Sequence, residues 1–299
     1  LLLTATVSGD DAAQLEAHAP GPFASLCLAG RARFATLSEE LREATGIDVE
    51  YRKCGVLRAA SSEQELARVV EETAWHEAVG AGRRVLSENE ARALEPGLGE
   101  RVVGGVLFEE DARVDPPKLL RALRIAAERA GASFRTGATV ARVSPEPRPA
   151  VLLSQGETLH CEHLVVAAGS WTPLIEGAPL ARTAIVPARG QIVELACDVP
   201  PQRSVLCDGD IYLSPRDDWR VLVGSTLEFV GFRTGVTASA IARLLGAAAR
   251  LLPALGEAEV TRFWSSFRPH TQDELPYIGE SGFRNVWLAS GHFRNGILL

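Results

Sequence analysis

The sequence predicts an α/β chain in which two folding units interleave. Helical and strand-like segments alternate through its first and middle parts, which is typical of α/β proteins. The run 164–168 is apolar throughout and predicts a strand buried on both faces. Residues 184–225 are instead rich in strands whose apolar and polar residues alternate, as expected of an antiparallel sheet with one face in water. Because the sheet type changes along the chain, the sequence predicts two units built from interleaved segments.

Periodicity and capping residues define the individual elements. A serine followed three residues later by a glutamate has the spacing of a capping box. This pattern occurs at Ser62 with Glu65 and at Ser87 with Glu90, so a helix is predicted to begin at each serine. Asp115, just before a proline, marks another helix start. The predicted helices are 26–45, 62–79, 87–95, 115–130 and 237–252. The predicted strands are 56–59, 102–108, 134–143, 151–153, 158–160, 164–168, 184–195, 204–213, 219–225, 259–267 and 286–289.

Composition excludes several classes of partner. The 299 residues are 46% hydrophobic and 23% charged, which suits a globular chain large enough for two cores. A formal net charge of -7 argues against nucleic-acid binding. The five cysteines include no C-x-x-C pair, which favours a reducing compartment and predicts a cytoplasmic protein. No membrane association is expected, because the most apolar long stretch, 238–255, is interrupted by Arg243 and Arg250.

Three motifs indicate a ligand site. The apolar strand within 164–173 ends in a small-residue turn at Gly169, where a cofactor can approach the backbone closely. The segment 263–269, Phe-Trp-Ser-Ser-Phe-Arg-Pro, places Arg268 among aromatic residues, and a planar guanidinium binds a carboxylate through two parallel hydrogen bonds. The segment 291–299, Gly-His-Phe-Arg-Asn-Gly-Ile-Leu-Leu, puts backbone N–H groups and a cation beside an anionic or polar ligand.

Together these motifs resemble the FAD-dependent D-amino-acid oxidase superfamily, and within it most closely the glycine oxidases of thiamine biosynthesis. The resemblance runs from about Leu2 to Leu299, with the motifs in the same order. It implies an α/β FAD-binding, Rossmann-like domain interleaved with an α+β substrate domain built on an antiparallel sheet. The implied FAD-binding domain comprises residues 1–48, 109–183 and 263–299, and the implied substrate-binding domain comprises residues 49–108 and 184–262.

The resemblance also implies the chemistry. Glycine, sarcosine or a small D-amino acid would transfer a hydride from its α-carbon to FAD. Molecular oxygen would reoxidise the flavin to give hydrogen peroxide, and hydrolysis of the imine would give an oxo acid and ammonia. This reaction would feed thiamine thiazole synthesis. Relatives of this type are often tetramers, so a homo-oligomer is expected.

Site residues are carried over one by one from the resemblance. Arg268 matches the carboxylate-binding arginine, Arg294 matches the second active-site position, and Tyr212 matches the tyrosine whose hydroxyl lies over the substrate; these three are the implied catalytic and substrate-binding residues. Asp210 stands where some glycine oxidases have a histidine, and it would alter amine preference if it faces the substrate. The implied cofactor-binding residues are Val140, Gly169, His292, Phe293, Arg294, Asn295, Gly296, Ile297 and Leu298.

One motif of the superfamily is not found in this sequence. No Gly-x-Gly-x-x-Gly follows a predicted strand, although the family holds the FAD pyrophosphate with this motif in its first βαβ unit. The FAD-binding domain is therefore expected to lack its N-terminal βαβ unit here. Two alternatives remain open: a flavin dehydrogenase of the same fold that passes electrons to a quinone or a protein, and a flavin-free binding module that retains the amino-acid pocket.

Two further histidine-containing segments are predicted to be structural. The residues at 160–163, His-Cys-Glu-His, have the composition of a metal site, but they are predicted in a turn without an evident fourth ligand, so no metal is predicted. His76, next to Trp75, is predicted on the solvated face of a charged helix.

Overall fold

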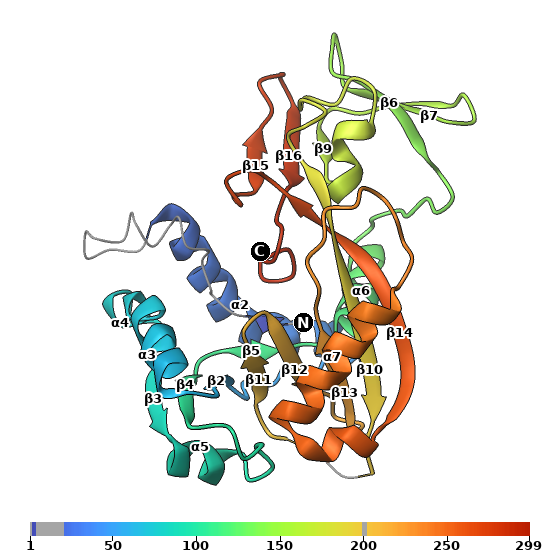
Figure 1. Ribbon diagram of the computed structural model, residues 1–299. Coiled ribbons are helices and arrows are strands. Elements are labelled where there is room, and N and C mark those ends of the chain that lie inside the picture. The colour runs from blue at the N-terminus through green and yellow to red at the C-terminus, as the bar shows by residue number, and fades with distance from the viewer. Residues whose placement is uncertain (1, 4–20, 199–201) are drawn as a thin grey trace.

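The computed structural model describes residues 2–3, 21–198 and 202–299, and it confirms an α/β architecture (Figure 1). A large sheet lies at the bottom of Figure 1 and a smaller one at the top, and long strands extend from the first towards the second. The described helices are α2 (Pro22–Thr45), α3 (Glu63–Glu72), α4 (Trp75–Ala78), α5 (Glu88–Leu94), α6 (Pro116–Arg129) and α7 (Ala238–Leu251), with short 3-10 helices at Gly169–Leu174 and Pro253–Glu257. No helix among these residues is long and apolar enough to cross a membrane.

An eight-stranded sheet is the largest element among the described residues. Its spatial order is β14-β10-β13-β12-β11-β2-β4-β3. Neighbouring strands are antiparallel except β11 and β2, which are parallel, so the antiparallel sheet predicted from the sequence is in fact mixed. These two strands come from distant segments, and no hairpin constrains their relative direction. The strands are β2 (Val56–Ala60), β3 (Arg84–Ser87), β4 (Gly104–Phe108), β10 (Val186–Ala196), β11 (Val205–Asp208), β12 (Ile211–Pro215), β13 (Arg220–Gly224) and β14 (Glu259–His270).

Helix α7 covers one face of this sheet. Leu244, Ala248 and Leu251 of the helix pack against inward-facing strand residues such as Val193 and Val223, and all five are buried. Thr237 caps the helix by accepting a hydrogen bond from the backbone N–H of Ala240, as the predicted start at this residue requires. Burial of this apolar face stabilises the sheet and leaves its other face free for polar chemistry.

Two three-stranded sheets and a short strand pair complete the described fold. In one sheet, β9 and β16 are parallel and β15 is antiparallel to β16; in the other, β6, β7 and β8 form a meander. Val143, Val166, Val286 and Leu288 form a small buried core between these two sheets. The strands are β1 (Leu2–Leu3), β5 (Ala112–Arg113), β6 (Val140–Ser144), β7 (Ala150–Leu153), β8 (Thr158–His160), β9 (Leu164–Val166), β15 (Tyr277–Glu280) and β16 (Val286–Ser290).

Four predicted elements need correction. The strand predicted at 204–213 is two antiparallel strands, β11 and β12, because the chain turns between Asp208 and Ile211. The strand predicted at 164–168 is the shorter β9, and its Val165 is 58% exposed, because no described element covers that side chain. The strand predicted at 134–143 begins only at Val140. The helix predicted at 62–79 is interrupted at Thr73, whose hydroxyl donates to the carbonyl of Val69 and ends α3.

His76 is buried, which corrects the predicted solvated position. Its ring is tilted against that of Trp75, with centroids 3.7 Å apart, and against that of Phe108, with centroids 4.6 Å apart. Its Nδ1 lies 3.1 Å from the carbonyl oxygen of Thr73. Burial lowers the pKa of His76 to about 4, and the neighbouring cation of Arg83 contributes in the same direction. The folded protein therefore favours the neutral imidazole.

Acidification from pH 7 to pH 4 is expected to destabilise the protein through His76. As the pH falls, the unfolded chain binds this proton near pH 6.5, whereas the folded chain binds it near pH 4. The contribution of His76 to stability is therefore complete above pH 6.5 and is lost progressively down to pH 4, by about 3 kcal/mol. Urea unfolding across this range measures the loss. His76→Phe should reduce the pH dependence of the free energy of unfolding, whereas His160→Gln, at an exposed position, should leave it unchanged. If the free energy of unfolding falls equally with pH in His76→Phe and in the parent, His76 is not the group responsible.

Candidate active site

Arg268 lies near the end of β14 and is held by backbone and hydroxyl oxygens. Its Nη1 donates to the carbonyl of Thr226 at 3.2 Å, and its Nη2 donates to Oγ of Ser225. Burial lowers its pKa, and the cation of Arg294 adds to this effect. Within the described part of the chain, no carboxylate forms an ion pair with Arg268. A desolvated cation without a counter-charge favours an anionic ligand at this position.

Two glycines allow Arg268 and Tyr212 to lie close to the sheet. A Cβ atom on Gly190 of β10 would stand 2.5 Å from Nη1 of Arg268, and one on Gly224 of β13 would stand 2.5 Å from Cζ of the Tyr212 ring. Both approaches are far shorter than van der Waals contact. We call Gly190 and Gly224 the glycine platform. Any larger residue at either position would displace the functional side chain above it.

Strand register places both side chains on one face of the sheet. Tyr212 pairs with Gly224, and Gly224 pairs with Ile192 on the next strand. Side chains alternate along a strand, so Gly190, which lies two residues before Ile192, is on the same face. Arg268, which pairs with Ala188, shares this face. Burial raises the pKa of the Tyr212 hydroxyl, and the cation of Arg268 partly offsets the rise. Two of the predicted catalytic residues are thus brought together.

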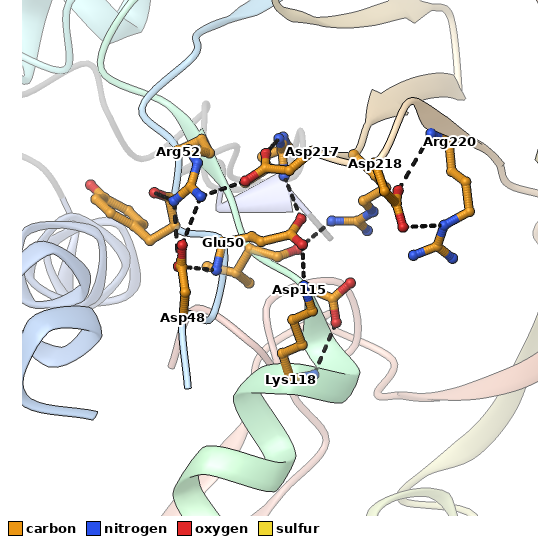
Figure 2. A network of polar contacts seen from close by, with 12 residues as sticks. Asp48, Glu50, Arg52, Asp115, Lys118, Asp217, Asp218 and Arg220 are labelled. Atoms are coloured by element: carbon orange, nitrogen blue, oxygen red, sulfur yellow. Dashed lines mark hydrogen bonds and ion pairs between the residues drawn. The ribbon is translucent and has the colours of Figure 1, made fainter. Parts of the chain in front are cut away.

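A polar network holds the hairpin that carries Tyr212 (Figure 2). Asp217, in the turn between β12 and β13, pairs with both Arg52 and Arg113. Buried Arg113 also contacts Glu50 at 3.3 Å, and Glu50 pairs with Lys118 at the start of α6. The pKa of Asp217 is lowered, since the hydrogen bonds and charges of the two arginines outweigh its burial. The network therefore fixes the turn against α6 and the segment before β2.

The carboxyl ends of the parallel strands β9 and β16 lie side by side. The Ser290 hydroxyl donates to the carbonyl of Gly169 at 3.0 Å and lies 2.9 Å from the hydroxyl of Thr172. Gly169 has a φ of +54°, and a Cβ atom built there would meet nothing within 4 Å. Open space over a glycine at the carboxyl end of parallel strands is where α/β sheets bind nucleotide ligands. Predicted Gly169 is therefore uncovered at the end of these strands, where a ligand can approach its backbone.

The segment 291–299 forms a tight loop that is pinned to the end of β14. The backbone N–H of Phe293 donates to the carbonyl of Pro269 at 3.1 Å, directly after Arg268. Phe293 is buried, and its ring contacts that of His270 edge-on, with centroids 4.8 Å apart. Its φ of +41° and the φ of +77° at Gly291 bend the chain sharply. The loop therefore connects Ser290, which contacts Gly169, to the residue that follows Arg268.

The other predicted residues of this loop divide between exposed and core-packed positions. Arg294 is exposed, with its guanidinium 5.1 Å from the Phe293 ring centroid. Burial lowers the pKa of half-buried His292, and its carbonyl accepts from the backbone N–H of Asn295 at 2.8 Å. Gly296 is exposed. The last two predicted residues, Ile297 and Leu298, pack with the core between α2 and α6.

Two predicted positions lie apart from this group. Val140 starts β6, pairs with Leu153 in the meander sheet and packs against the small core that includes Val166. Asp210 occupies the tight turn between β11 and β12, and its side chain is exposed. Among the described residues, His, Cys, Asp and Glu side chains form no group of three that would hold a metal ion. The segment 160–163 joins β8 to β9.

Comparison with known families identifies the family of the chain. Residues 3–299 match the family described as FAD dependent oxidoreductase. The chain belongs to this family. FAD is the cofactor of the family, and the open space over Gly169 and the sharply bent loop 291–299 fit a flavin dinucleotide placed at the ends of β9 and β16. The resemblance drawn from the three sequence motifs is thereby confirmed.

Individual relatives give the same result. A bifunctional ThiO/ThiG protein of Synechocystis sp. is 36% identical over an alignment of 317 residues. The alignment covers 99% of this chain and 46% of that protein. A glycine oxidase of Geobacillus kaustophilus is 33% identical over 290 residues, which cover 96% of this chain and 77% of that enzyme. A crystal structure of glycine oxidase from Geobacillus kaustophilus matches with a TM-score of 0.91 and 30% identity over 100% of this chain and 79% of that one. The chain thus spans about half the length of the bifunctional relative.

Sequence motifs missed the residues that position Arg268. Ser225 and Thr226 hold its guanidinium, and Gly190 and Gly224 leave room for the two functional side chains. One signal was present in the sequence: glycines inside the strand-like runs 184–195 and 219–225 mark close approach of another group to the backbone. The hydroxyl and carbonyl partners carried no such signal.

Proposed function

We propose that the protein oxidises glycine, or another small amino acid or amine such as sarcosine or a D-amino acid, at its α-carbon. The balanced reaction joins the amino acid, O₂ and water and releases the oxo acid, hydrogen peroxide and the amine, which is ammonia from glycine or a D-amino acid and methylamine from sarcosine. The observation that carries this proposal is Arg268, a desolvated guanidinium without a carboxylate partner among the residues described. A substrate carboxylate supplies the missing charge through two parallel hydrogen bonds.

In this proposal the protein acts chiefly by orientation. Arg268 holds the carboxylate, which limits the positions open to the α-carbon, and Tyr212 on the same face offers its hydroxyl to the bound substrate. FAD, when bound, accepts the hydride. No side chain is required as a base if the amine binds in its neutral form, so the rate depends on how well the α C–H is aimed. Arg268, Tyr212 and Arg294 are the residues that we propose for substrate binding and catalysis.

An aromatic cluster lies on the other face of β14. The ring of Phe232 lies 5.4 Å from that of Phe267 and 5.3 Å from that of Trp171, measured between centroids. Phe267 pairs with Arg189 of β10, whereas Arg268 pairs with Ala188, so the cluster and Arg268 are on opposite faces. The cluster therefore does not line the proposed carboxylate site.

An anaerobic absorbance spectrum of the full-length protein tests the proposal. A flavin spectrum that bleaches on addition of glycine and recovers with air, with release of peroxide, is the expected result. Bleaching that air does not reverse would instead identify a dehydrogenase with another electron acceptor. A flavin spectrum untouched by glycine, sarcosine and D-alanine would overturn the substrate assignment. A colourless protein that does not bind added FAD would favour a binding module.

We also propose the organisation and context of the protein. Residues 1–48, 109–183 and 263–299 would form the FAD-binding domain, and residues 49–108 and 184–262 the substrate domain. Residues 1 and 4–20 of the first segment lie outside the described residues. β14 crosses the boundary at residue 263 and would link the two domains. A role in supplying thiamine thiazole synthesis, a cytoplasmic location and a homo-oligomeric state belong to the same proposal and rest on the resemblance to glycine oxidases.

A further inference from the structure

A buried arginine on β10 ties down the segment that follows β13. Arg189 is 5% exposed, and its Nε donates to Oε2 of Glu228 at 3.0 Å. Its Nη1 donates to the carbonyl of Gly235 at 2.7 Å and to that of Arg233 at 3.2 Å. One guanidinium thus binds both ends of the segment 228–235. A buried cation with these partners depends on the Glu228 carboxylate for charge balance.

Gln191 binds the same carboxylate from the next position on this face. Its side chain is fully buried, and its Nε2 donates to Oε1 of Glu228 at 2.7 Å. Its Oε1 accepts from the backbone N–H of Thr237 at 2.7 Å, and its own backbone N–H donates to Oγ1 of Thr226 at 3.0 Å. Both carboxylate oxygens of Glu228 are therefore used. We call Arg189, Gln191 and Glu228 the clamp.

The clamp and Arg268 lie on opposite faces of β10. Side chains alternate along a strand, so Arg189 and Gln191 face away from Gly190, over which the Arg268 guanidinium lies. The backbones of Arg189 and Glu228 exchange hydrogen bonds of 2.8 Å and 3.0 Å. This pairing fixes the chain two residues beyond Thr226, whose carbonyl holds Arg268. The backbone of Glu228 is thus held two residues from the carbonyl that binds Arg268, although Glu228 does not touch Arg268.

We propose that Glu228 is a positioning residue for the substrate carboxylate site. By binding Arg189 and Gln191 beneath the sheet, it keeps Ser225 and Thr226 where they orient the Arg268 guanidinium above it. Loss of the carboxylate frees the segment 225–237 and lets Arg268 leave its orientation. The inference rests on the proposed role of Arg268 in binding the carboxylate.

The test compares Glu228→Gln with a matched control on the same sheet. Glu194 of β10 is buried, and its carboxylate accepts from Arg220 at 2.5 Å and from Thr261 at 2.9 Å. It lies opposite Arg262, far along β14 from Arg268. Both variants replace an ion-paired carboxylate by an amide, and the Glu228 side chain, 26% exposed, is the less buried of the two. Glu194→Gln is expected to change thermal stability only, because it leaves Ser225 and Thr226 in place.

In the full-length protein, Glu228→Gln is expected to raise KM for glycine at least 10-fold, with kcat changed by less than about 3-fold, because uniform binding is lost while the chemical step is kept. The dissociation constant of acetate, a carboxylate without an amine, should rise by the same factor in calorimetry, and Arg268→Ala should abolish acetate binding. If Glu228→Gln does not fold, Arg189→Lys provides a second test. Lysine keeps the charge but loses the planar guanidinium that reaches Glu228 and two carbonyls, so it should raise KM by a similar factor.

Separate outcomes distinguish this inference from the proposed function. One outcome would overturn only the positioning role of Glu228. In it, folded Glu228→Gln keeps the KM for glycine and the acetate affinity of the parent, while Arg268→Ala still loses acetate binding. An equal rise in KM in Glu194→Gln would also overturn it, since the effect would then be general destabilisation. Failure of the parent protein to bind acetate or glycine would overturn the role of Arg268 itself, and the clamp with it.

Discussion

Replacing Arg268 with lysine is expected to raise KM for glycine by about 100-fold while leaving the flavin spectrum unchanged. Lysine keeps the charge but offers no planar fork, so one charge-assisted hydrogen bond to the carboxylate is lost, worth about 1.5–3 kcal/mol. Steady-state kinetics over a wide glycine range measures the change. Tyr212→Phe should have a milder effect, about 5-fold, because a neutral hydrogen bond contributes about 1 kcal/mol.

Arg262 provides the matched control for this substitution. It lies on the same strand, with its guanidinium 5.0 Å from the Trp264 ring centroid, and it is exposed. Arg262→Lys should therefore leave KM within a factor of two or so, as expected of a surface substitution. If Arg268→Lys and Arg262→Lys have the same KM, the carboxylate does not bind at Arg268.

Gly190→Ala is expected to lower kcat/KM for glycine by about 100-fold without unfolding the protein. The new Cβ atom would stand 2.5 Å from Nη1 of Arg268, so the guanidinium must move by about 1 Å, and a displacement of that size costs about 100-fold in an oriented reaction. The contacting atoms are the flexible end of a side chain, so the backbone remains in place. Kinetics together with thermal unfolding separates the lost activity from stability.

The control for the glycine platform is Gly246→Ala in α7. A Cβ atom there would meet only Nη1 of Arg250, at an ordinary 3.6 Å, and alanine should stabilise the helix by about 0.5–1 kcal/mol. In the Arg268→Lys background, Gly190→Ala should add little, because both substitutions act through the same guanidinium. Additive effects of the two changes would show that Gly190 acts by another route.

Local features of the sequence predicted most helices and several strands. At α5 the capping box is complete, because Ser87 and Glu90 satisfy each other's backbone N–H groups within four residues. Asp115 likewise caps α6 through the backbone N–H of Lys118 at 2.9 Å. Errors arose where the outcome depended on distant partners. His76 became buried because Phe108 of β4 packs on its ring, and no local signal marks that contact.

Sequence by itself therefore determined the family, the capped helices, and the identity of Arg268 and the loop 291–299 as a candidate site, because motifs and caps are read over short stretches of chain. Only the tertiary structure decided how the site is assembled. Tyr212 and Arg268 come to share one face through the register of β12, β13, β10 and β14. Ser225, Thr226 and the clamp meet Arg268 for the same reason: strand pairing joins residues that are dozens of positions apart, and no local pattern specifies that pairing.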